Sequence, residues 1–160
     1  MNFDLNALLI AKGIDPRKVV VMRHRPPEPR LAKVIGWLAA EKPDIFNAYQ
    51  STQGISVENA MKKMCGDGYL ASFIGDGAGK ALFIGIYRID AFKVMTAQEY
   101  ADHPANRYLN EFGHLGFTPT PTQETILWFD LELTEHYACQ SASNSFQLSA
   151  SKSFQFVRLI

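Results

Sequence analysis

YLASFIGDGAGKALFIGIYRID, from Tyr69 to Asp90, contains two apolar, strand-favouring runs separated by a glycine-rich loop. The runs are Tyr69–Ile74 and Ala81–Ile89, and the loop is GDGAGK. Glycine readily adopts the positive φ angles that tight hairpin loops need, and a run of glycines would disrupt a helix or a strand interior. The pattern therefore predicts a β-hairpin. Because the second run is apolar at almost every position, we expect it to be covered on both faces and central in its sheet.

The loop also invites comparison with a phosphate-binding P-loop. A P-loop needs a glycine, four residues and then Gly-Lys-Ser/Thr, because its amides surround the phosphates and its hydroxyl holds Mg²⁺. Here Gly79 and Lys80 are followed by Ala81, which has no hydroxyl, and the position of the first glycine is taken by Ile74. A P-loop also leads into a helix, whereas this loop leads into a predicted strand. The spacing therefore favours a plain hairpin turn.

Length and composition restrict the class of protein. With 160 residues, 47% of them hydrophobic, the chain is most simply one domain with enough apolar surface for a core. The formal net charge is zero, so a nucleic acid would have to be met by a local patch. Cys65 and Cys139 form no CxxC motif, which indicates reduced thiols in a cytoplasmic protein. No signal peptide or membrane span is expected.

The segment RHRPPEPR, Arg23–Arg30, is the dense basic region of this neutral chain. Three prolines keep it extended and remove backbone donors. It follows a short predicted strand, Val19–Met22, and leads into an amphipathic helix predicted for Pro29–Glu41. Two interpretations are open: a rigid arm that presents guanidinium groups to phosphates, or a solvated loop whose arginines pair with nearby carboxylates.

A polar and aromatic stretch, Ile45–Gly54, supplies candidate base-reading residues. If the segment is helical, one face carries Phe46, Tyr49, Gln50 and Gln53. If it is extended, Tyr49 and Gln50 point to opposite faces. A tyrosine ring can stack on a base and carboxamides can bond to its edge, so Tyr49, Gln50 and Gln53 form a candidate reading surface. The alternative is that tyrosine and glutamine close a turn.

The remaining patterns complete an α+β fold. Residues 96–99 match a capping box and predict a short helix that His103-Pro104 ends. Residues 106–122 are predicted to be a long irregular connection, and the alternation of Ile126–Leu133 predicts a half-buried strand. The serine-rich segment 134–160 is predicted to form edge strands or a tail. We expect a small mixed or antiparallel sheet, or a partly open barrel, with short flanking helices.

Four separated motifs carry a resemblance to a known family: MRHRP at Met22–Pro26, FNAYQSTQG at Phe46–Gly54, YLASFIG at Tyr69–Gly75 and KALFIGIYRID at Lys80–Asp90. They resemble the N-terminal domain of bacterial proteins that carry a GIY-YIG nuclease domain at the C-terminus, over roughly residues 1–133. The resemblance implies a PUA-like or EVE-like fold, a small mixed-β module associated with recognition of modified bases. It also implies the DNA-reading part of a restriction-type or defence nuclease.

No catalytic, metal or cofactor site is expected in the chain itself. There is no G-x-S-x-G motif, and the histidines are not spaced as paired ligands. Gly85-Ile86-Tyr87 has no Tyr-Ile-Gly or Tyr-Val-Gly partner, and the spacing of Arg107 and Glu111 does not single them out as the arginine and glutamate of a nuclease site. The nuclease domain of the family is therefore expected to be absent here.

The leading hypothesis is a nucleic-acid-binding module that recognises modified or distorted DNA. The candidate contacts, which combine phosphate-binding cations with base-reading side chains, are Arg23, His24, Arg25, Arg30, Tyr49, Gln50, Gln53, Lys80 and Arg88. The expected partners are DNA and a nuclease domain or subunit, and no membrane partner is expected. Two alternatives are a metal-dependent endonuclease that uses Tyr87 and an arginine, and a protein-interaction module that regulates a separate nuclease.

Overall fold

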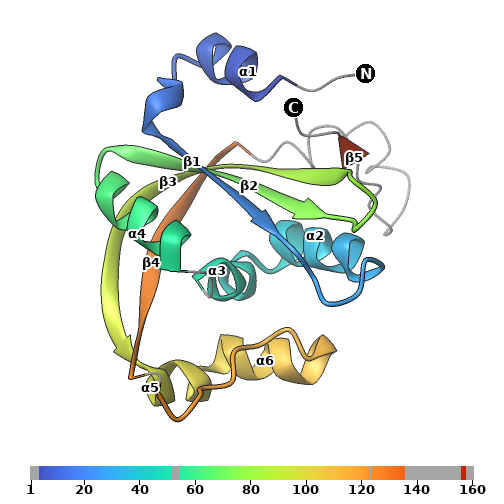
Figure 1. Cartoon of the computed structure of the whole chain (residues 1–160), viewed down its shortest axis with the longest axis vertical. Coiled ribbons are helices and arrows are strands. Elements are labelled where there is room, and N and C mark those ends of the chain that lie inside the picture. The colour runs from blue at the N-terminus through green and yellow to red at the C-terminus, as the bar shows by residue number, and fades with distance from the viewer. Residues whose placement is uncertain (1–3, 52–54, 123, 136–155, 158–160) are drawn as a thin grey trace.

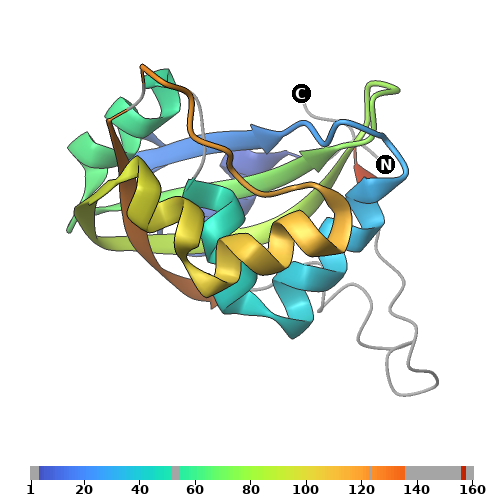
Figure 2. The same cartoon turned by 90° about the horizontal axis from the view of Figure 1, so that it is seen from below.

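A mixed β-sheet with helices on both faces forms the body of the computed structural model, which describes residues 4–51, 55–122, 124–135 and 156–157 (Figures 1 and 2). The main strand order is β1-β2-β3-β4, with β1 parallel to β2 and the other neighbours antiparallel. The strands are β1 (Val19–His24), β2 (Gly68–Gly75), β3 (Ala81–Thr96) and β4 (Thr125–Glu135). The expected α+β class is confirmed, and within the described residues the sheet is open rather than closed into a barrel.

The hairpin of β2 and β3 lies at the centre of the sheet, as its sequence predicts. The β3 side chains from Ala81 to Tyr87 are all buried. In the loop, the Asp76 carboxylate accepts hydrogen bonds from the amides of Ala78 at 2.8 Å and Lys80 at 3.0 Å. The hydrogen bond from Ala78 is the main cause that lowers the pKa of Asp76, and the bond from Lys80 acts in the same direction. The carboxylate therefore closes the turn from within.

The β3 strand is longer than predicted. Its pairing with β2 ends at Ile89, but its pairing with β4 continues to Thr96. The register with β4 shifts between Ile89 and Ala91, and such an irregularity lets a strand bend. Beyond that point β3 continues to pair with β4. The predicted half-buried alternation of β4 holds in part: Phe129 is 1% exposed and Asp130 is exposed, but Ile126 and Leu127 are both buried and Leu133 is 38% exposed.

The apolar side chains of the sheet form two cores, one on each face. On one face, residues such as Leu70 and Ile84 pack with α2 (Leu31–Glu41), α3 (Pro43–Ser51), α4 (Ile55–Met64) and α6 (Pro104–Gly113). On the other face, Phe73 and Phe83 pack with Leu9 of α1 (Leu5–Ala11). Figure 1 shows α1 on one side of the sheet and α2, α3 and α6 on the opposite side. The hairpin is therefore covered on both faces.

Two predicted elements need correction. Residues 106–122 are not irregular throughout, because Pro104 occupies the first turn of α6 instead of blocking a helix. The His103 side chain accepts a hydrogen bond from the amide of Ala105 at 3.2 Å and so caps α6. The helix predicted from Pro29 begins at Leu31.

Two ambiguous segments take the following form. The stretch Ile45–Gly54 is helical as far as Ser51, and residues 52–54 lie outside the described part of the chain. The serine-rich segment also lies largely outside it, at 136–155 and 158–160, while β5 (Phe156–Val157) pairs with Ala81 and Leu82 of β3. In the described residues, no helix has the length and apolar character that crossing a bilayer requires.

Replacing Thr96 by alanine is expected to lower the free energy of unfolding by about 1 kcal/mol. The Thr96 hydroxyl accepts a hydrogen bond from the Glu99 amide at 3.0 Å, and the Glu99 carboxylate accepts one from the Thr96 amide at 2.9 Å, at the start of α5 (Ala97–Asp102). Chemical denaturation measures the change. Thr122→Ala, in an exposed turn, is the matched control, and an equal loss in both variants would contradict the capping role.

Candidate nucleic-acid interface

The segment Arg23–Arg30, here called the arm, separates two surface clefts. β1 ends at His24 opposite Ile74 of β2, so the arm leaves the sheet at the same end as the β2–β3 loop (Figures 1 and 2). Side chains two residues apart on an extended chain share one side, which places Arg23 and Arg25 together and His24 opposite. His24 is 1% exposed and faces the core, whereas Arg25 is exposed.

The first cleft, here called the glycine cleft, lies between the arm and the hairpin loop and has a volume of about 280 Å³. It is lined by Arg23, Arg25, Pro29, Gly75, Gly77 and Gly79 among others. The second, here called the aromatic cleft, lies on the other side of the arm and has a volume of about 380 Å³. It is lined by His24, Arg25, Tyr49, His114, Leu115 and Phe117 among others. Arg25 borders both clefts.

Tyr49 forms part of the wall of the aromatic cleft. Its ring lies 4.7 Å from the ring of His24 and 6.1 Å from that of Phe46, and the residue is 8% exposed. Burial raises the pKa of Tyr49 to about 12, so its hydroxyl stays protonated at neutral pH. Burial also lowers the pKa of His24 to about 3, so this imidazole is neutral. Both side chains are therefore uncharged at neutral pH, but His24 is 1% exposed and Tyr49 belongs to the larger core, so the cleft wall here is mostly buried.

Gln50 lies behind the aromatic cleft rather than on its surface. It is 1% exposed and close enough to His24 to favour the protonated imidazole slightly, against the larger effect of burial. Neither carboxamide atom makes a hydrogen bond of regular geometry within the described residues. Of the two candidate base-reading residues that the structure describes, Tyr49 borders a cleft and Gln50 does not, while Gln53 lies outside the described part of the chain.

Arg23 is held against the hairpin at the glycine cleft. A Cβ atom added to Gly75 would lie 2.9 Å from Nε and 3.3 Å from Nη2 of Arg23, so the guanidinium rests where a side chain would otherwise be. Nη2 donates to the carbonyl of Lys80 at 3.4 Å, while the buried Nε has no acceptor among the described residues. Lys80 itself is exposed in the loop. No carboxylate borders this cleft.

The other predicted cations are paired with carboxylates. Arg30 pairs with Glu28 in the arm, and Arg88 pairs with Asp90 and Glu132 on the sheet, away from both clefts. The side-chain hydrogen bond from Arg30 lowers the pKa of Glu28. Arg30 and Arg88 therefore agree with the second interpretation of the sequence, in which the arginines are solvated and paired with carboxylates.

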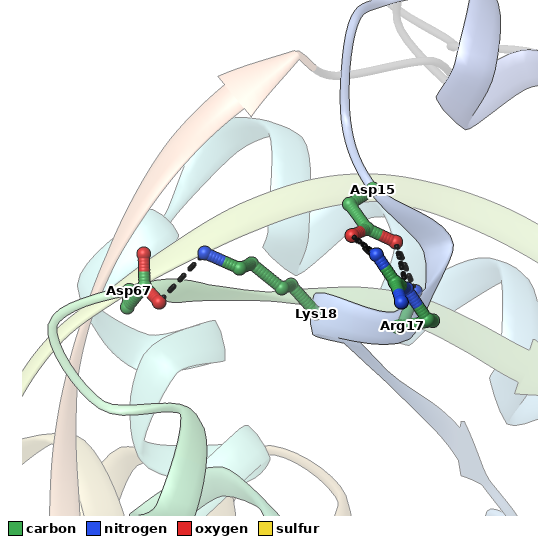
Figure 3. A network of polar contacts seen from close by, with 4 residues as sticks. All are labelled: Asp15, Arg17, Lys18 and Asp67. Carbon is green, nitrogen blue, oxygen red and sulfur yellow. Dashed lines mark hydrogen bonds and ion pairs between the residues drawn. The ribbon is translucent and has the colours of Figure 1, made fainter.

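Two further cations at the start of β1 are neutralised in the same way. The Arg17 guanidinium pairs with Asp15 at 2.9 Å, and the Lys18 ammonium pairs with Asp67 at 2.7 Å (Figure 3). The side-chain hydrogen bond from Arg17 is the main cause that lowers the pKa of Asp15. Among the described residues, Arg23 and Arg25 are therefore the arginines between positions 17 and 30 that form no ion pair with a carboxylate.

A third cavity, of about 450 Å³, is acidic. It is bordered by Asp44, Asp90 and Asp130, together with Tyr87 and Trp128. Carboxylates repel phosphate groups, so the larger volume does not make this cavity the better nucleic-acid site. Within the described ranges, no three histidine, cysteine, aspartate or glutamate residues are grouped so as to hold a metal ion.

The sequence did not single out the residues that complete the aromatic cleft. Leu115 and Phe117 come from the connection after α6, and Asn106 holds this connection in place. The buried Asn106 carboxamide accepts from the Phe117 amide at 2.7 Å and donates to the Phe117 carbonyl at 2.9 Å. A polar residue at a buried helical position was the available signal, because such a side chain needs hydrogen-bond partners nearby.

Comparisons with protein-family models, with curated proteins and with solved structures find no match for this chain. The fold class is therefore assigned from the structure alone: an α+β protein with an open mixed sheet. A cationic arm at one end of that sheet separates a glycine-lined cleft from an aromatic one.

Proposed function

We propose that this chain is a nucleic-acid-binding module that recognises modified or distorted DNA and has no catalytic activity of its own. The position of Arg25 carries the proposal: its exposed guanidinium borders both the aromatic cleft and the glycine cleft. A nucleotide has an aromatic base and an anionic phosphate. The aromatic cleft suits the base, the arginines of the glycine cleft suit the phosphate, and Arg25 borders both clefts.

The aromatic cleft has the properties that suit an exposed base. Ring faces stack on bases regardless of sequence, and the cleft is lined by the aromatic side chains of Tyr49 and Phe117, with the Tyr49 hydroxyl uncharged at neutral pH. Taking a base out of a duplex costs a few kcal/mol, and this cost is lower for a mismatched or damaged base. Such a pocket therefore favours DNA whose target base is already loosened.

The family resemblance supports the same proposal. Three of the four motifs contribute residues to the clefts: Arg25 comes from the first motif, Tyr49 from the second and Gly75 from the third. We therefore propose that the module is the DNA-reading part of a GIY-YIG-type restriction or defence nuclease, acting with a nuclease domain or subunit.

Arg25→Ala is expected to weaken DNA binding about tenfold, because a hydrogen bond to a charged group contributes roughly 1.5 kcal/mol or more. Fluorescence anisotropy of a labelled oligonucleotide at two salt concentrations measures this. Binding should also weaken as salt rises, since phosphate contacts release counterions.

Arg88→Ala is the matched control, because Arg88 is also exposed but is paired with two carboxylates outside both clefts. This variant should bind DNA like the parent. Absence of binding at low salt, binding without salt dependence, or an equal effect of both substitutions would refute the proposal. Nicking of DNA with Mg²⁺ that disappears in Tyr87→Phe would favour the endonuclease alternative.

A further inference from the structure

We infer that the glycine cleft is a binding site for a single phosphate group, either free or part of a nucleic-acid backbone. This inference adds a phosphate site to the proposed DNA-binding function. It depends on that function only where it assigns the phosphate to a DNA backbone. The aromatic cleft plays no part in the argument, so each site can fail without the other.

The guanidinium of Arg23 is positioned in advance for an anion. It lies over Gly75, and its Nη2 donates to the Lys80 carbonyl at 3.4 Å, so the guanidinium is already at the cleft before an anion binds. No carboxylate pairs with it in the described residues, and its buried Nε lacks an acceptor. A partly buried, uncompensated positive charge attracts an anion more strongly than an exposed, ion-paired one.

Arg25 is a second arginine that borders the same cleft as Arg23. It lies two residues after Arg23, and Pro26, which follows it directly, also borders the cleft. The arm is not extended throughout as its prolines predicted, because residues 27–30 form bends and a turn. The planar guanidinium group donates two parallel hydrogen bonds to the oxygens of a phosphate. Two such groups facing one cleft match the charge of a phosphate group.

The hairpin loop leaves room for the phosphate. Gly77 and Gly79 both have positive φ angles, of 78° and 83°, so the loop keeps glycine where it borders the cleft. A Cβ at Gly79 would meet no heavy atom within 4 Å, whereas one at Gly77 would lie 2.9 Å from Pro29, so the open part of the loop is at Gly79. The nearby Asp76 carboxylate accepts hydrogen bonds from the amides of Ala78 and Lys80, and it remains a negative charge in the loop that the two arginines must outweigh.

The arrangement differs from a P-loop in the origin of its charge. A P-loop combines its own lysine and hydroxyl with helix amides, whereas here the two cations come from the arm after β1. The loop contributes its shape and its lack of side chains. This explains how a loop with the wrong P-loop spacing can still border a phosphate site.

Gly75→Ala is the sharpest test, because it changes no charge. The new methyl group would lie 2.9 Å from Arg23 Nε, at the flexible end of a side chain, so the guanidinium should move while the fold persists. We expect saturable binding of inorganic phosphate to the parent, followed by calorimetry, and about tenfold weaker binding in Gly75→Ala and in Arg25→Ala. Gly113→Ala is the matched control, because its methyl group would make only ordinary contact, at 3.5 Å from Leu115.

The outcomes separate the two proposals. Absence of saturable phosphate binding, or parent-like binding by both Gly75→Ala and Arg25→Ala, overturns the phosphate site. If DNA still binds with Arg25 dependence in that case, the proposed function stands. Phosphate binding without DNA binding supports the site and rejects the proposed function. A dinucleoside phosphate that competes with inorganic phosphate assigns the site to backbone phosphates, whereas competition only by phosphate monoesters assigns it to terminal or free phosphate.

Discussion

Replacing Phe73 by alanine is expected to lower the free energy of unfolding by about 3–5 kcal/mol. Phe73 is 0% exposed, and its ring lies 4.8 Å from that of Phe83 on the adjacent strand. Together they form the centre of the smaller core, which α1 covers through Leu9. Few neighbours can move into the space left by the ring, because the backbone there belongs to the central strands. The loss therefore combines lost burial with an unfilled cavity.

Phe112→Ala is the matched control for this prediction. Phe112 is 41% exposed, so its removal creates no enclosed cavity and should cost less than half as much. Chemical denaturation of both variants, with equal slopes against denaturant, gives the comparison. Similar losses in the two variants would show that the hairpin is not the stabilising centre of the sheet.

Acidification from pH 7 to pH 5 is expected to lower the free energy of unfolding by about 2 kcal/mol through His24 alone. Burial lowers the pKa of this histidine to about 3 in the folded protein, below the ordinary value of 6.5 that applies in the unfolded chain. Above pH 6.5 both states are neutral and the histidine favours neither. Below pH 6.5 the histidine binds a proton in the unfolded chain but not in the folded protein, so the free energy of unfolding falls as the pH decreases towards 3.

His24→Gln should flatten this dependence between pH 7 and pH 5, whatever it does to the stability at pH 7. The matched control is His114→Gln, which replaces an exposed histidine that also borders the aromatic cleft. The carboxylates of Asp15, Glu28 and Asp76 have lowered pKa values and stay ionised in this window. A parent-like slope in His24→Gln would contradict the burial of a neutral imidazole.

The parts of the fold that local sequence determines could be predicted. The hairpin follows from two strand-favouring runs around a loop that needs positive φ, and the capping box at Thr96 follows from two side chains three residues apart. The alternation in β4 gave its half-buried character. In each case the physical cause lies within a few consecutive residues.

The missed features depend on partners distant in sequence. The helix α6 was not predicted because a proline can either end one helix or begin the next. The hydrogen bond by which the His103 side chain caps α6 shows that Pro104 begins a helix here. The length of β3 depends on a bulge against β4. A polar residue at a helical position marks Asn106 as needing partners, but the local sequence does not indicate that the partner is Phe117 on the connection after α6.

The candidate site was predictable in composition but not in arrangement. The arginines and prolines of the arm are evident in the sequence, as is the aromatic character around Tyr49. Which arginines remain unpaired depends on where the carboxylates fall: Glu28 takes Arg30, and Asp90 and Glu132 take Arg88. The side of the arm on which each arginine lies is set by the end of β1.

The most direct test of the central idea, that the arm presents a base site and a phosphate site to DNA, is NMR mapping of amide shifts during titration with a mismatched duplex. We predict that the changes concentrate on Arg25, on Gly77 in the hairpin loop and on Leu115 and Phe117 beside Tyr49, and that they decrease with added salt. Changes centred on the acidic cavity around Asp44 and Asp130, with the arm unaffected, would contradict the account.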